Sequence, residues 1–125
     1  MQIRLAETAG FCFGVERAVA LAEQTARTCK NAVTLGPIIH NRHVVERFER
    51  LGLHEISSAE EAEPGQTVVI RAHGIPVSEQ RMLSARGAAA VDATCPFVKK
   101  IHVIAQKAER DGRSLLIIGT PTHPE

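Results

Sequence analysis

The sequence contains no tryptophan and no tyrosine, and only four of its 125 residues are phenylalanine. Its core must therefore be built from Val, Ile, Leu and Ala side chains, which suits a parallel β-sheet covered by helices. The formal net charge is only +1 and no basic stripe contains interleaved aromatic residues, so nucleic-acid binding gains no support. No apolar run could span a membrane, and the N-terminus is too polar for a secretory signal. We expect a cytoplasmic protein that binds neither nucleic acid nor membrane.

Cysteine is also scarce. Cys12, Cys29 and Cys95 are an odd number of thiols, and no CxxC pair occurs. In a reducing compartment this disfavours a disulfide framework and leaves core packing or chemistry as the roles of these residues.

Short apolar runs alternate with segments of helical periodicity along the whole chain. A length of 125 residues is enough for one ordinary domain. The alternation predicts an α/β fold, with a parallel sheet and flanking helices. We expect strands at 2–6, 32–35, 54–56, 67–71, 88–91 and 115–118, helices at 15–29, 41–51, 78–86 and 96–110, and one helical turn within 57–65.

Residues capable of chemistry follow the predicted strands. Cys12, His40, His73, Cys95 and His123 each lie in the turn after a predicted strand. The carboxyl ends of parallel strands share one edge of a sheet, and ligands of such sheets bind beyond that edge. The pattern therefore predicts that thiols and imidazoles gather on one rim.

Cys12 lies between two glycines, and Cys95 precedes a proline that fits the first turn of a helix. The start of a helix favours a thiolate, which is the form that binds metals. We interpret both cysteines as metal ligands, and Cys29 as a packing residue at the end of a helix. From the residues alone, zinc with added histidines and an iron–sulfur cluster both stay open.

The histidines favour an anion. Imidazoles donate hydrogen bonds to phosphate oxygens and titrate near neutral pH, so His40, His73 and His123 are candidate anion ligands or proton carriers. Glu125 lies beside His123 and could relay a proton. We interpret His43, His54 and His102 as structural residues.

Together these turns resemble those of the 4-hydroxy-3-methylbut-2-enyl diphosphate reductases, the last enzymes of the methylerythritol phosphate route to isoprenoids. The resemblance covers the chain from end to end. The motifs that carry it are GFCFGV at 10–15, GPIIHN at 36–41, AHG at 72–74, DATCP at 92–96 and HPE at 123–125.

The resemblance implies an oxygen-sensitive [4Fe–4S] cluster held by three cysteines, with Cys12 and Cys95 as two of them. It implies that His40, His73 and His123 bind the allylic diphosphate substrate, and that His123 and Glu125 supply protons. The expected reaction removes the substrate hydroxyl and gives isopentenyl and dimethylallyl diphosphate. The expected electron donor is a ferredoxin- or flavodoxin-like protein.

The resemblance also implies a fold of three lobes and a third cluster cysteine beyond residue 125. Cys29 is a poor substitute, because a helix of about 15 residues would carry it some 20 Å from Cys12. We expect residues 1–95 to form the first lobe, including an N-terminal strand, and residues 96–125 to open an incomplete second lobe. The chain is then an N-terminal fragment, inactive alone.

Two alternatives remain. The chain could be a stand-alone domain that binds a phosphorylated metabolite through its histidines without redox chemistry, or a zinc module built from Cys12, Cys95 and histidines. Motif matches alone do not decide between these classes.

Overall fold

The computed structural model describes residues 1–120. The helices are α1 (Phe13–Thr28), α2 (Arg42–Arg50), the 3-10 turn η1 (Ala59–Glu61), α3 (Val77–Ala85) and α4 (Pro96–Arg110), and the strands are β1 (Ala32–Leu35), β2 (His54–Ile56), β3 (Thr67–Ile70) and β4 (Ala89–Asp92). The four strands form one sheet in the order β2-β1-β3-β4, and every neighbouring pair is parallel. The predicted α/β class is confirmed.

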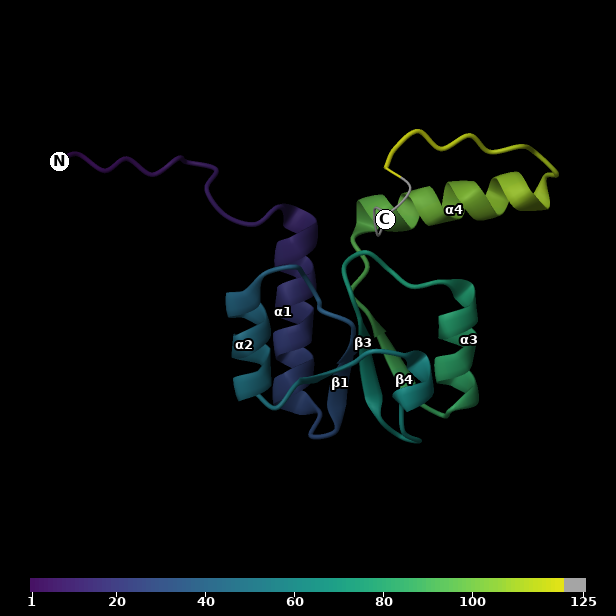
Figure 1. The fold of residues 1–125 in the computed structure, drawn as a ribbon, viewed down its shortest axis with the longest axis horizontal. Helices are drawn as coiled ribbons and strands as arrows, with labels where there is room; N and C mark the ends of the chain where they lie inside the picture. Colours follow the sequence, from purple (N-terminus) through teal and green to yellow (C-terminus); the bar gives the residue numbers. More distant parts are fainter. Residues whose placement is uncertain (121–125) are drawn as a thin grey trace.

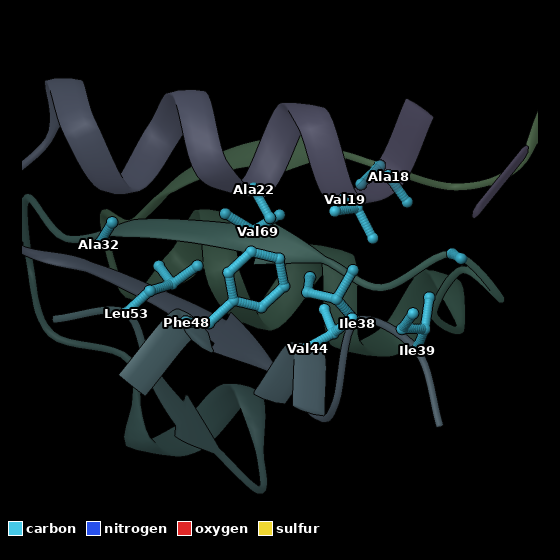
Figure 2. Packing of buried hydrophobic residues seen from close by; sticks show 12 residues of the cluster. Ala18, Val19, Ala22, Ala32, Ile38, Ile39, Val44, Phe48, Leu53 and Val69 are labelled. Atoms are coloured by element: carbon cyan, nitrogen blue, oxygen red, sulfur yellow. The ribbon is translucent and has the colours of Figure 1, made fainter. Parts of the chain in front are cut away.

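Strand alternation builds a core on each face of the sheet. Ala32 and Val69 belong to the core on one face, whereas Val33 and Val68, which are paired in register, belong to the core on the other. Helices α1 and α2 cover the first face, and α3 covers the second (Figure 1). In the first core the ring of Phe48 lies among Ile38, Leu53 and Val69 (Figure 2).

Short local signals fix the helix ends. Asn41 caps α2, with its side chain accepting a hydrogen bond from the Val44 N–H at 3.3 Å. Ser58 and Glu61 form a capping box around η1. Pro96 occupies the first turn of α4, where a missing N–H leaves no bond unmade. The predicted helices are therefore confirmed to within about two residues, the uncertainty usual for helix ends.

Two predicted strands are wrong. Residues 2–6 and 115–118 are irregular, and their side chains are exposed, as Leu5 and Ile118 illustrate at 87% and 92%. The first segment leads away from the sheet and the second passes over α4 (Figure 1). A strand needs the backbone of a neighbour, and among residues 1–120 neither segment has one.

The sheet contains a switch point between β1 and β3. The chain leaves β1 for α2 on one face and leaves β3 for α3 on the opposite face (Figure 1). Connections that diverge in this way leave a crevice beyond the carboxyl ends of the two strands, which is where α/β sheets bind ligands. Within residues 1–120, none of the helices combines the length and apolar character needed to cross a membrane.

Candidate functional site

The turns after β1, β3 and β4 meet at the carboxyl end of the sheet, beside the start of α1. A cavity of about 330 Å³ lies there. Its lining includes both predicted metal ligands, Cys12 and Cys95, and two of the predicted anion ligands, His40 and His73. The His40 and His73 rings have their centroids 5.3 Å apart, at the switch point between β1 and β3.

Backbone hydrogen bonds continue the sheet beyond its strands and hold these turns together. The Ala72 N–H donates to the Ile38 carbonyl at 3.3 Å, and the Cys95 N–H donates to the Ala72 carbonyl at 2.8 Å. One ladder thus joins the turn that bears His40, the turn that bears His73 and the turn that bears Cys95. Turns that are held by such hydrogen bonds move less than free loops do, so the lining of the cavity is preorganised.

Cys12 reaches the cavity differently from the prediction. No strand precedes it; it is the residue before the first turn of α1, and its side chain is exposed. Cys95 occupies the same position relative to α4 and is half-buried. Both thiols therefore lie at helix N-termini, and the expected setting of Cys12 after a strand is corrected to the start of a helix.

Gly14 explains how α1 can lie so close to Cys95. It is buried, and a Cβ atom on it would overlap the Cys95 Sγ and lie 3.1 Å from the Cys95 Cβ. Only glycine leaves room for the thiol here, so the second glycine of the GFCFGV motif is a packing requirement of Cys95.

A polar network supports the Cys95 turn. The Asp92 carboxylate accepts a hydrogen bond from the Thr94 N–H at 3.0 Å and forms an ion pair with Lys99. Burial alone would raise the pKa of Asp92, but the hydrogen bonds from Lys99 and Thr94 outweigh burial and lower the pKa below its usual value. The carboxylate therefore stays charged and keeps both partners at neutral pH.

A second cavity, of about 500 Å³, adjoins the first between α3, α4 and the sheet. His73 lines both cavities, and His102, which we interpreted as structural, lines the second. A Cβ on Gly74 would lie 2.6 Å from His102 Cε1, so the turn after His73 packs directly on this imidazole. This contact joins the turn after β3 to a residue in the middle of α4, and no local sequence pattern signals it.

The remaining candidate residues lie away from the two cavities or outside the described part of the chain. Cys29 ends α1 and packs against the first core, as its predicted packing role requires. His123 and Glu125 lie outside the described residues. Among residues 1–120, no group of three His, Cys, Asp or Glu side chains is placed to hold a metal ion together.

The chain thus contains a parallel α/β domain whose strand-end turns bring two thiols and two imidazoles to one cavity. The family model described as LytB protein matches residues 3–125, and the chain belongs to this family.

Known relatives agree with that assignment. The chain is 45% identical over 126 residues to the 4-hydroxy-3-methylbut-2-enyl diphosphate reductase of Aquifex aeolicus, with 100% of this chain and 43% of that protein covered. It is 48% identical to the reductase of the same name from Nitratidesulfovibrio vulgaris, covering 100% of this chain and 45% of that protein. The chain therefore spans less than half the length of these relatives.

Solved structures show the same fold. A structure of (E)-4-hydroxy-3-methyl-but-2-enyl diphosphate reductase aligns with a TM-score of 0.82 at 45% identity, over 98% of this chain and 43% of that one. A structure of the E-1-hydroxy-2-methyl-but-2-enyl-4-diphosphate reductase from Plasmodium falciparum aligns with a TM-score of 0.85 at 28% identity, over 94% of this chain and 37% of that one.

Proposed function

We propose that this chain is the N-terminal part of an iron–sulfur reductive dehydroxylase that acts on 4-hydroxy-3-methylbut-2-enyl diphosphate. The observation that carries the proposal is the single cavity lined by Cys12, Cys95, His40 and His73 in a chain of the LytB family. In the reaction, two electrons and two protons convert the allylic alcohol into isopentenyl or dimethylallyl diphosphate, and the hydroxyl leaves as water.

The donor set of the cavity fits part of a [4Fe–4S] cluster. Cysteine thiolates are the usual ligands of such clusters, and Cys12 and Cys95 share the cavity while Gly14 leaves space for the Cys95 sulfur. When bound, the cluster would supply electrons to the substrate. A third cysteine would come from the part of the relatives that this chain does not span.

His40 and His73 would bind the diphosphate. Imidazole N–H groups donate to phosphate oxygens, and the two rings are close enough to contact one diphosphate group from the crevice. In this proposal His123 completes the anion site and relays protons with Glu125, while a ferredoxin- or flavodoxin-like protein supplies the electrons. We further infer that residues 96–125 open a second lobe, because α4 lies across the end of the sheet and outside both helix layers (Figure 1).

A chimera tests the proposal. This chain would replace the matching segment of the Aquifex aeolicus reductase, and the purified protein would be reconstituted with iron and sulfide without oxygen. We expect cluster absorbance and reductase activity in the chimera. Cys12→Ser and Cys95→Ser should each abolish activity and disturb the cluster spectrum, whereas the matched control Cys29→Ser should leave both intact.

The same chimera distinguishes the proposal from the binding-domain alternative. That alternative predicts that inorganic diphosphate binds the unmodified 125-residue chain with an affinity unaffected by Cys12→Ser or Cys95→Ser, and that the chimera holds no cluster. Under the proposal, His40→Ala or His73→Ala in the chimera should weaken substrate binding by roughly 10- to 100-fold, the effect of losing a hydrogen bond to a charged group. An active chimera indifferent to Cys12 and Cys95 would refute our assignment.

A further inference from the structure

Both polar groups of the peptide between Thr94 and Cys95 form hydrogen bonds. The Cys95 N–H donates to the Ala72 carbonyl at 2.8 Å, within the ladder that extends the sheet. The Thr94 carbonyl accepts a hydrogen bond from Arg17 Nη1 at 3.2 Å. The first bond ties Cys95 to its neighbour in the sheet, and the second ties it to a different element, α1.

Arg17 and Cys12 belong to the same rigid unit. α1 begins at Phe13, directly after Cys12, and Arg17 lies near its start. Arg17 is separated from Thr94 by 77 residues, so its hydrogen bond joins the segment that carries one thiol to the turn that carries the other. Gly14 allows α1 to approach Cys95, but a missing side chain can only permit the approach. Arg17 supplies an attraction that holds it.

We propose that Arg17 is a positioning residue that fixes the separation of the Cys12 and Cys95 thiols. The inference rests on the proposed function, in which both thiols hold one metal centre. Arg17 itself lines neither cavity, so it acts through the Thr94–Cys95 peptide. A guanidinium is a charged donor, and its hydrogen bonds to carbonyl oxygens are stronger than those between neutral groups.

A purely structural role for Arg17 would have a different signature. Arg17 is exposed and does not belong to either hydrophobic core. Its loss should therefore change the thiol geometry much more than the stability of the fold. The test must measure both quantities in the same variants.

The test measures thiol bridging in the reduced, metal-free 125-residue chain. Dibromobimane becomes strongly fluorescent when it links two neighbouring thiols, and a Cys29→Ser background leaves only Cys12 and Cys95 to react. In this background Arg17→Met, which removes the donor but keeps the chain length, should lower the bridging rate about fivefold, because a hydrogen bond from an exposed side chain has the modest strength of an ordinary one. Arg17→Lys keeps a charged donor and should restore most of the rate.

Arg27→Met is the matched control, because Arg27 is an exposed arginine in the last turn of the same helix. It should bridge at the unsubstituted rate, and any fall in the urea midpoint of Arg17→Met should be too small to unfold the chain under the conditions of the bridging assay. Equal bridging in Arg17→Met and the unsubstituted background would overturn the positioning role and leave the proposed function intact. A drop in bridging that arises because Arg17→Met is unfolded under the assay conditions would also overturn it. Absence of bridging without any arginine substitution would instead contradict the shared thiol site of the proposed function.

Discussion

Gly14→Ala tests the packing between α1 and the Cys95 turn. The new Cβ would overlap the Cys95 Sγ and lie 3.1 Å from the Cys95 Cβ and 3.8 Å from its Cα. Rotation of the Cys95 side chain would relieve only the contact with the sulfur. The remaining close contact is with Cβ, so relief requires a small shift of α1 or of the turn.

Opposing effects set the magnitude. Alanine is favoured over glycine in a helix by up to about 1 kcal/mol. Overfilling a packed site costs about 1–3 kcal/mol. We therefore expect Gly14→Ala to lower the free energy of unfolding by about 1–2 kcal/mol in the otherwise unaltered chain. In a Cys95→Ala background the overlap with the sulfur is gone and only the 3.1 Å contact with the Cβ remains, so the same substitution should cost about 1 kcal/mol less.

The measurement is a double-mutant cycle by urea unfolding, with Gly14→Ala, Cys95→Ala and the double variant compared under reducing conditions. The coupling free energy should be about 1 kcal/mol, within the range found for residues in direct contact. If the two substitutions add to within about 0.5 kcal/mol, the contact between Gly14 and Cys95 does not exist as described and our packing argument fails.

Three further predictions concern stability. Phe48 is 3% exposed, so Phe48→Ala should lower the free energy of unfolding by about 3–5 kcal/mol, whereas the more exposed Leu51→Ala should cost far less in the same urea titration. Asn41→Ala should cost about 1 kcal/mol by removing the cap of α2, and Asn41→Asp should retain most of that stability. The pKa of Asp92 is lowered in the fold, so its charged form stabilises the fold above about pH 4. This stabilisation disappears as the pH falls through the pKa that Asp92 has in the folded chain. Asp92→Asn should therefore be less stable than the unaltered chain at pH 7, by less than about 1 kcal/mol because the carboxyl is 39% exposed. This difference should shrink as the pH falls below about 4, and a difference that stays constant into the acid range would contradict the assignment.

The helices and the sheet strands were predictable because each has a strong local signal. Asn41 and Pro96 mark helix starts, and the β-branched run before Arg71 marks β3. The same reasoning failed for residues 2–6 and 115–118, whose apolar character resembles that of the true strands. Local β-preference is not sufficient for a strand, because its hydrogen bonds require a neighbouring backbone that the described chain does not provide there.

Only some residues of the candidate site could be predicted from the sequence. His40, His73 and Cys95 could be placed on one rim from the sequence, since parallel strands bring their carboxyl ends to one edge and each of these residues follows a strand. Arg17 and His102 could not be recognised as neighbours of that rim from the chain order. Arg17 approaches Thr94 only because α1 packs across the sheet, and His102 approaches Gly74 only because α4 crosses the sheet end.

The sequence by itself determined the class of fold and the identity of the chemical groups, because helix caps, turn residues and apolar periodicity act over a few neighbouring residues. Only the tertiary structure decided that Cys12 enters the site from a helix start, that Gly14 makes room for Cys95, and that Arg17 reaches the Thr94–Cys95 peptide. These contacts join residues far apart in the chain, and their geometry depends on how whole helices pack, which no local pattern encodes.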